Sequence, residues 1–334
     1  MSLPEIETPR SDVVDDYHGT VVADPFRWAE DMDAPETEKW VEAQNERTAS
    51  YLADTSQAEI RSRIEQLWDF PRTAVPRRRA DWYFFTHNDG LQDQPVLYRR
   101  RGLNSSDHVV LDPNTFSEDG AVALVDYSVT DAGSLMAYTV AEAGSDWQTV
   151  RVYDLEQGRE LPDELHFVKY TYLPWLPDVS GFLYERFPEP GPDVRPSTDQ
   201  KVYFHTLGTD QDEDVLVYER PDDPDLGFIT TISDDKEYLF LYTWRGTEPR
   251  NGLYYRSLAD DGDFVRLLED GEAKYELAGN VGSRIFLLTD LSADRGKIIA
   301  IDLEDPAREN WEHVVPEGDD TLQTAVIVGD RILA

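Results

Sequence analysis

The chain contains no cysteine, and this absence removes three classes of chemistry at once. Its 334 residues can form no disulfide bridge, no thiolate nucleophile and no cysteine-based zinc site. No run of 18 apolar residues occurs either, so the sequence predicts no membrane-spanning helix. The amino terminus, MSLPEIETPRSD, lacks the basic and then apolar order of a secretory signal. Together these features predict a cytoplasmic protein.

Lysine is scarce, with only six residues, whereas acidic residues are abundant. The 68 aspartates and glutamates face 31 lysines and arginines, which leaves a formal net charge of −37. Nucleic acid or an anionic membrane would be repelled by this field, so we expect neither as a partner. The acidic residues gather in turn-like stretches at 210–214, 221–225 and 259–263, where we expect solvated surface. Such an acidic, lysine-poor surface resembles halophilic proteins and predicts loss of structure at low salt.

The usual short motifs of catalysis are missing as well. The chain has no Gly-x-Ser-x-Gly elbow, no phosphate-binding glycine loop, no His-Glu-x-x-His pair and no dinucleotide fingerprint. Six single histidines are interpreted as surface or packing residues: His18, His87, His108, His166, His205 and His313. The stretch 210–214 imitates a calcium loop, but Val215 stands where that loop needs glycine, so a solvated hairpin is expected. The residues alone therefore predict no metal, no cofactor and no active site.

What the chain does contain is a repeat of about 50 residues. A short apolar strand recurs with Leu97, Val152, Val202, Leu253 and Ile298 at its centre, in steps of 55, 50, 51 and 45 residues. A second signal precedes it, in which a polar turn leads into a β-rich run at 135–138, 182–184, 238–241 and, more weakly, 285–288. Four-stranded sheets at this period are typical of a β-propeller, whereas a β-sandwich would show turn signals every 8–12 residues. We therefore predict a mainly β protein with a propeller.

Residues 1–72 follow a different pattern and predict a helical N-terminal arm. Asp33 and Ser56 each begin a capping sequence ahead of a helical stretch. In the second helix the apolar positions are Ile60, Ile64, Leu67 and Trp68, a stripe on one face that needs a partner. The predicted division is thus a helical arm at 1–72 and a propeller at 73–334.

Several strings in this chain resemble the prolyl oligopeptidase family of serine peptidases, and they are collinear from about residue 10 to the end. The strings are Asp16-Tyr17-His18-Gly19, Asp24-Pro25-Phe26-Arg27-Trp28-Ala29-Glu30-Asp31, Val41-Glu42-Ala43-Gln44-Asn45, Gly90-Leu91-Gln92-Asp93-Gln94-Pro95-Val96-Leu97-Tyr98, Ser145-Asp146-Trp147-Gln148-Thr149, Leu161-Pro162-Asp163 and Leu207-Gly208-Thr209-Asp210-Gln211. The resemblance implies a helical arm, a seven-bladed propeller and a C-terminal α/β-hydrolase domain that carries the catalytic serine, aspartate and histidine. It also implies cleavage of short peptides after proline, with the propeller limiting access.

Relative to that family pattern, about five blades are expected here, with the chain ending in the sixth at Ala325–Ala334. No catalytic residue is expected in this chain, which alone should be inactive. Its expected partners are short proline-containing peptides and its own missing C-terminal hydrolase domain. The arm would pack on that domain, which would explain the unpartnered helical stripe.

The resemblance also implies a modest share of the substrate cleft. Tyr170 aligns with an aromatic position upstream of the scissile bond, with a buried strand tyrosine as the alternative. Asp146 and the loop of Trp244, Arg245 and Thr247 align with positions that face the central cavity. The family usually has an arginine where Trp244 stands, with Arg245 one step on.

Two other functions are compatible with a propeller. A stand-alone, non-catalytic propeller would bind a peptide or protein partner on one face, although the terminal strand and the helical stripe would then stay exposed. A five-bladed glycosidase would need inward-facing carboxylates from successive blades, whereas the recognisable acids lie in turns.

Overall fold

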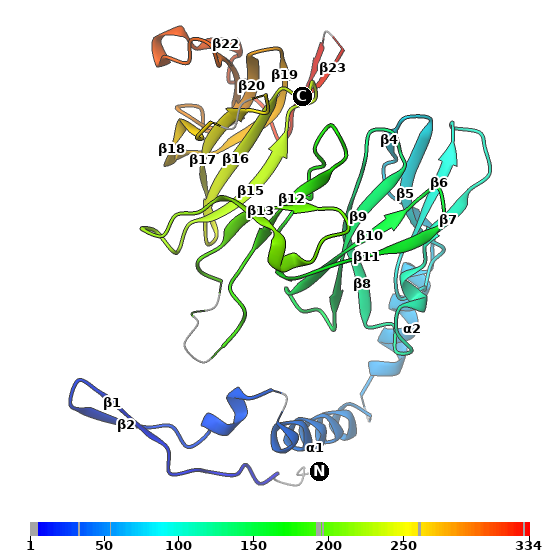
Figure 1. The fold of residues 1–334 in the computed structure, drawn as a ribbon. Helices are drawn as coiled ribbons and strands as arrows, with labels where there is room; N and C mark the ends of the chain where they lie inside the picture. Colours follow the sequence, from blue (N-terminus) through cyan, green and yellow to red (C-terminus); the bar gives the residue numbers. More distant parts are fainter. Residues whose placement is uncertain are drawn as a thin grey trace. The chain divides into compact units, whose positions relative to one another are not determined.

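The computed structural model describes residues 6–32, 34–53, 55–191, 195, 197–259, 262–329 and 331–334. The chain forms two compact units (Figure 1). The first unit contains the residues up to Arg72 together with Asp89–Leu91, and the second contains Thr73–Asn88 and Gln92–Ala334. No helix in the described part of the chain combines the length and the apolar character that a membrane crossing needs.

The first unit consists of a hairpin and two helices. Its elements are β1 (Val14–Tyr17), β2 (Thr20–Ala23), the 3-10 turn η1 (Arg27–Glu30), α1 (Pro35–Leu52) and α2 (Gln57–Trp68). The hairpin turn uses His18 and Gly19, both with positive φ, which matches the twist of a two-residue antiparallel connection. The predicted cap Asp33 lies outside the described residues, and α1 starts at Pro35 after Ala34.

The second helix begins where the sequence predicted, but without the predicted capping bond. Ser56 is the N-cap residue of α2, yet its side chain makes no capping hydrogen bond. Instead the Thr55 hydroxyl accepts a hydrogen bond from the amide of Gln57 at 3.3 Å. The apolar side chains of Ile60 and Trp68, like those of the rest of the predicted stripe, are more than half exposed.

The second unit is a succession of antiparallel sheets in chain order. The first repeat follows β3 (Arg72–Thr73), which lies at the boundary of the units, and contains β4 (Arg77–Arg79), β5 (Trp82–Asn88), β6 (Val96–Arg101) and β7 (His108–Leu111), with η2 at Pro113–Thr115. The second repeat contains β8 (Val122–Val129), β9 (Leu135–Glu142), β10 (Gln148–Asp154) and β11 (Arg159–Val168).

The third repeat departs from the predicted four-stranded pattern. It contains β12 (Gly181–Arg186), β13 (Lys201–Thr206), η3 (Gln211–Glu213) and β14 (Val215–Tyr218). Its first strand is replaced by an irregular segment after Val168, which forms the isolated bridge Trp175–Phe182 with β12 instead of a regular ladder. Tyr170 and Leu173 in this segment have φ values of 53°, which interrupts a regular ladder.

The remaining repeats are regular, as the sequence predicted. The fourth contains β15 (Gly227–Ile232), β16 (Tyr238–Arg245), β17 (Glu248–Ser257) and β18 (Val265–Ala273). The fifth contains β19 (Tyr275–Val281), β20 (Arg284–Thr289), β21 (Lys297–Asp302), η4 (Arg308–Asn310) and β22 (Glu312–Val315), and a hairpin follows with β23 (Val326–Val328) and β24 (Arg331–Leu333).

Alternation along single strands explains how these sheets stack. In β12, Phe182 and Tyr184 pack toward the second repeat, whereas Leu183 packs toward the fourth. In β16, Leu239 packs toward the third repeat and Phe240 toward the fifth. Successive side chains point to opposite faces of a strand, so a continuous apolar run buries both faces of its sheet. Each such side chain contributes roughly 1.5–3 kcal/mol, and the core is therefore built between sheets.

Candidate functional site

Tyr170, Asp146 and Trp244, three of the five predicted site residues, meet at one end of the sheets. Asp146 lies in the turn between β9 and β10, Tyr170 follows β11, and Trp244 lies near the end of β16. The rings of Tyr170 and Trp244 are 5.9 Å apart and nearly perpendicular, at 86°, an edge-to-face arrangement that aromatic pairs favour. Partial burial and the neighbouring Asp146 carboxylate raise the pKa of Tyr170. Tyr170 is 46% exposed, so it is not a buried strand tyrosine.

Trp244 is held in place by the backbone of the neighbouring strand. Its indole Nε1 donates a hydrogen bond to the carbonyl oxygen of Phe228 at 3.3 Å. The ring lies directly over Gly227, where a Cβ atom would come within 2.2 Å of it. Only glycine allows so close an approach of a ring to the backbone.

The other two predicted residues, Arg245 and Thr247, are placed differently. The Arg245 guanidinium makes a two-pronged ion pair with Asp223, with distances of 2.6 and 3.1 Å, and this pair lowers the pKa of Asp223. Thr247 lies in the exposed turn between β16 and β17. Among the described residues, no hydrogen bond or ion pair joins either side chain to Tyr170 or Asp146.

Lys169 and Trp147 extend this cluster, and the sequence analysis did not select them as site residues. The Lys169 Nζ lies 3.9 Å from the centre of the Trp147 ring, a cation–π contact, and 3.4 Å from the Ser197 hydroxyl. Lys169 is 7% exposed. Residues 146–147 and 169–170 therefore contact each other in two ways. The Lys169 ammonium lies on the Trp147 ring, and the Tyr170 hydroxyl lies beside the Asp146 carboxylate.

A fully buried carboxylate supports the segment that carries Tyr170. Glu185 in β12 accepts hydrogen bonds from the Thr171 hydroxyl at 2.5 Å and from the amide and hydroxyl of Thr230 in β15, both at 2.7 Å. Burial raises the pKa of Glu185 to about 7, although these three hydrogen bonds favour the ionised form. The third and fourth repeats are thus joined directly behind Tyr170.

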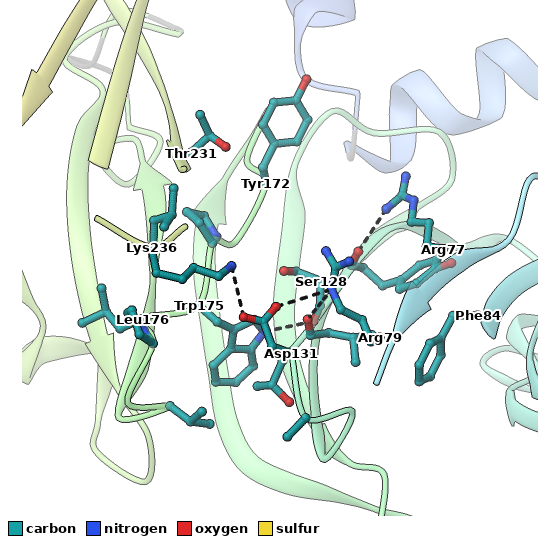
Figure 2. A pocket seen from close by; sticks show the side chains of 18 of the residues that line it. Arg77, Arg79, Phe84, Ser128, Asp131, Tyr172, Trp175, Leu176, Thr231 and Lys236 are labelled. Carbon is teal, nitrogen blue, oxygen red and sulfur yellow. Dashed lines mark hydrogen bonds and ion pairs between the residues drawn. The ribbon is translucent and has the colours of Figure 1, made fainter. Parts of the chain in front are cut away.

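A second feature is a cavity of about 460 Å³, which we call the axial pocket because first strands of different repeats line it (Figure 2). Arg77 and Arg79 come from β4, Asp126 and the turn at Asp131 come from β8 and its end, and Thr231 comes from β15. Residues of the segment 172–177 and Lys236 also line the pocket. Both wall carboxylates, Asp126 and Asp131, belong to one repeat, which differs from the successive-blade pattern that a glycosidase would need.

The axial pocket and the Tyr170 cluster lie at opposite ends of the sheets. In β9, the turn at 131–134 precedes the strand and the turn that contains Asp146 follows it. In β16, Lys236 precedes the strand and Trp244 lies near its end. The two turns that flank a strand lie at its opposite ends, so Asp131 and Lys236 are about a strand's length from Asp146 and Trp244. The segment 172–177 runs from the Tyr170 cluster into the lining of the pocket.

The acidic stretch 210–214 is not the fully solvated hairpin that the sequence predicted. The side chain of its last residue, Asp214, is fully buried and lies 2.7 Å from His205 Nδ1, while His205 Nε2 lies 3.1 Å from Asp163. Tyr184 donates a hydrogen bond to the other oxygen of Asp214 at 2.6 Å. Burial opposes a charge on His205, but the hydrogen bonds with Asp163 and Asp214 outweigh it and raise its pKa to about 9. A charged histidine therefore links the second repeat to the third.

The acidic stretches at 221–225 and 259–263 are closer to the solvated surface that the sequence predicted. The side chain of Asp222 is mostly exposed. The predicted surface residues Asp260 and Asp261 lie outside the described residues.

The repeat length could have indicated the polar contacts between sheets that the sequence analysis did not predict. The pair Glu185–Thr230 is separated by 45 residues, His205–Asp163 by 42 and Arg77–Tyr127 by 50. These separations are close to one repeat, because equivalent strands of adjacent sheets stack on each other. Polar residues about one period apart are therefore the pairs to test in such a sequence.

The comparisons with known proteins agree with this architecture. Residues 6–334 match the family model described as prolyl oligopeptidase, N-terminal beta-propeller domain, which confirms the predicted propeller. The chain is 33% identical over 321 residues to the prolyl endopeptidase of Elizabethkingia meningoseptica, covering 95% of this chain and 45% of that protein. It is 31% identical to prolyl oligopeptidase A of Galerina marginata, covering 99% of this chain and 50% of that protein.

Solved structures give the same result. A structure from an analysis of two prolyl endopeptidases and their inter-domain dynamics matches with a TM-score of 0.86 and 33% identity, over 99% of this chain and 49% of that one. Prolyl oligopeptidase B from Galerina marginata, bound to a 35-residue substrate for hydrolysis and macrocyclisation, matches with a TM-score of 0.79 and 29% identity, over 96% and 49% of the two chains. The chain thus spans about half the length of the relatives it matches.

Proposed function

Since this chain belongs to the prolyl oligopeptidase family, we propose that it is the substrate-admitting propeller of a serine endopeptidase that cleaves short peptides after proline. The nucleophile, base and oxyanion hole of that reaction would come from a hydrolase domain in the half of the relatives that this chain does not match. That domain is the proposed partner of the chain, and the proposed compartment is the cytoplasm. On its own the chain is expected to be inactive.

The observation that carries this proposal is the aromatic pair of the half-exposed Tyr170 and the partly buried Trp244 beside Asp146. A partly exposed aromatic pair with one carboxylate is typical of a peptide-binding surface, because rings supply contact area at low entropic cost and the carboxylate fixes orientation. The flat rings are suited to pack against a proline ring or an apolar side chain. Asp146 would favour the positively charged amino end of a short peptide.

Arg245 and Thr247 have lesser roles in this proposal. Both Nη atoms of Arg245 already donate hydrogen bonds to Asp223, so the charge of Arg245 is neutralised before a substrate binds. Arg245 would therefore fix the loop and Thr247 would offer a hydroxyl at its tip. Lys169 and Glu185 would position Tyr170 from behind.

The test compares the chain alone with a fusion that joins it to the catalytic half of the Elizabethkingia meningoseptica prolyl endopeptidase. A chromogenic peptide with proline before the chromophore should stay intact with the chain alone and be cleaved by the fusion. In the fusion, Tyr170→Ala should raise KM roughly tenfold and change kcat less, since it removes binding and not chemistry. Val215→Ala, which shortens an exposed side chain of β14 outside the arm, is the control and should change neither.

Two outcomes would contradict the proposal. Cleavage by the chain alone would place the chemistry inside it. A folded fusion that binds proline peptides without cleaving them would instead favour a non-catalytic propeller that binds peptide or protein partners.

A further inference from the structure

The axial pocket carries a local excess of positive charge in a strongly acidic protein. Three cations line it, Arg77, Arg79 and Lys236, against the two carboxylates of Asp126 and Asp131. The whole chain has a net charge of −37 and only six lysines, so a cationic lining is contrary to its composition. The cationic lining gives the cavity a positive electrostatic potential, opposite in sign to that of the protein as a whole.

The strand β4 sets the direction of the two arginines. Successive side chains of a strand alternate, so Arg77 and Arg79 share one face and Arg78 lies on the other. Arg77 and Arg79 line the axial pocket, and Arg78 does not. Arg78 instead donates from Nε to the carbonyl oxygen of Ala80 at 3.0 Å.

The donors of these cations are only partly used. Arg79 donates from Nε to Val129 O at 3.2 Å and from Nη1 to Arg78 O at 3.0 Å. Arg77 donates from Nη1 to Asp126 at 3.2 Å. Among the described residues, no hydrogen bond uses the Nη2 group of either guanidinium. Since a guanidinium has five N–H donors, each arginine keeps donors for an anion.

Lys236 and Asp131 point toward each other in the lining of the pocket (Figure 2). The Lys236 ammonium lies 3.2 Å from one oxygen of Asp131, and Arg79 lies 4.0 Å from the other. The Asp131 side chain is 64% exposed on a turn, so this carboxylate is held weakly. Lys236 and Arg79 thus already lie on either side of one carboxylate. This arrangement indicates that the two cations can bind the carboxylate of a ligand.

The pocket also has an aromatic wall. Trp175 is buried and its Nε1 donates to Ser128 O at 3.0 Å, which fixes the ring. Tyr172 is mostly exposed on the same segment. If the carboxylate of a ligand binds near Arg79 and Lys236, the adjoining part of that ligand would contact the rings of Trp175 and Tyr172.

We propose that the axial pocket is a second peptide site, which binds the carboxylate end of a short peptide between Arg79 and Lys236. The peptide class rests on the proposed function, whereas the carboxylate specificity rests on the pocket. A volume of about 460 Å³ lies in the range of small-ligand sites. A single carboxylate fits better than a phosphate ester, because the overall negative field repels a doubly charged group more strongly.

Calorimetric titration of the chain with Gly-Pro-Phe and with its C-terminal amide tests this assignment. The acid has no net charge and the amide is positive, so the field of the whole protein favours the amide. Tighter binding of the acid, by roughly tenfold, would therefore report a local carboxylate site, since a hydrogen bond to a charged group has about this effect. Binding of the amide as tightly as the acid overturns the proposal.

Substitutions in the axial pocket test where the acid binds, because some should weaken its binding and one should strengthen it. Arg79→Gln and Lys236→Gln should each reduce the preference for the acid to about twofold. Asp131→Asn removes the competing carboxylate and should strengthen acid binding about threefold. Arg78→Gln removes the same charge from the other face of β4 and should leave the preference unchanged. A preference that survives in the Arg79→Gln, Lys236→Gln double variant, with an unchanged circular dichroism spectrum, overturns the proposal.

Two further arms separate this site from the proposed function. If Tyr170→Ala abolishes acid binding while Arg79→Gln does not, the carboxylate site is wrong and the Tyr170 cluster keeps its proposed role. If neither the acid nor the amide binds, the peptide class fails for both sites. Inorganic phosphate that displaces Gly-Pro-Phe at equal concentration would overturn the peptide assignment in favour of a general anion site.

Discussion

The Glu185 carboxylate and Thr230 are joined by two hydrogen bonds of 2.7 Å, from the threonine amide and from its hydroxyl, although the residues belong to different sheets. Both groups are fully buried. A buried carboxylate must be neutralised or receive several hydrogen bonds, and here the donors come from the neighbouring sheet and from Thr171. The position of Tyr170, next to Thr171, therefore depends on how the third and fourth repeats dock.

This carboxylate should make stability depend on pH in an unusual direction. Because burial raises the pKa of Glu185 from 4.5 to about 7, the folded state binds a proton that the unfolded state releases between these values. Stability should then fall as pH rises from about 5 to 8, by up to roughly 3 kcal/mol. Glu185→Gln can keep the Thr230 contacts and donate to Thr171, so it should gain stability over the native chain by that amount at pH 8.

Urea unfolding of both proteins at pH 5 and pH 8, in constant high salt, measures this difference. Glu164→Gln, at an exposed position of β11, is the control; because it keeps Glu185, its stability should follow that of the native protein at both pH values. A Glu185→Gln variant that follows the native protein at both pH values would show that Glu185 does not titrate in this range.

His205 should act in the same direction, but over a higher pH range. The hydrogen bonds with Asp163 and Asp214 raise its pKa from 6.5 to about 9, despite burial, so the folded state holds its proton more tightly than the unfolded state. The stabilisation is complete below pH 6.5 and disappears as pH rises through about 9. His205→Gln leaves two buried carboxylates without a cation and should lose about 3 kcal/mol at pH 6.

Thermal or urea unfolding between pH 6 and 10 provides the measurement. His166→Gln is the matched control, because His166 is half exposed and contacts Glu164 on the surface of the same sheet. Its unfolding free energy should change by less than about 0.5 kcal/mol. Equal losses in the two variants would show that the buried ion network has no special role.

The net charge of −37 leads to a prediction about salt. Repulsion between exposed carboxylates falls when the Debye length shrinks from about 30 Å in dilute buffer to about 3 Å in molar salt. We expect the circular dichroism spectrum of the native fold in molar salt and partial or full unfolding in dilute buffer. An identical spectrum and melting temperature in both solutions would contradict this. Sucrose at equal osmolality is the control, since it stabilises without screening charge.

The sequence predicted the sheets well because their signal is local. The strands β9, β12, β16 and β20 each contain a continuous apolar run, and such runs mark strands that are buried on both faces. The irregular segment that replaces the first strand of the third repeat could not be predicted in this way. Its shape depends on Glu185 and on Trp175, whose hydrogen-bond partners lie in other strands.

The candidate site was less predictable for the same physical reason. Tyr170, Asp146 and Trp244 were selected through the family resemblance, and no local pattern marks them. Lys169 was missed because its partner is the face of Trp147, which lies in a turn of the preceding repeat. Composition gives the number of charges but not which of them are buried, so Asp214 was placed on the surface.

Gly227 offers a direct test of how Trp244 is positioned. A Cβ atom at this residue would lie 2.2 Å from the indole, so Gly227→Ala must displace the ring or the strand. Overpacking of this kind costs about 1–3 kcal/mol, and the displaced ring should lose its edge-to-face contact with Tyr170. Gly262→Ala is the matched control, since no atom lies within 4 Å of its added Cβ. We expect Gly227→Ala to lower the melting temperature and to weaken binding of proline peptides, whereas Gly262→Ala changes neither. Retention of peptide affinity by a destabilised Gly227→Ala variant would show that Trp244 is a packing residue and that Tyr170 binds without it.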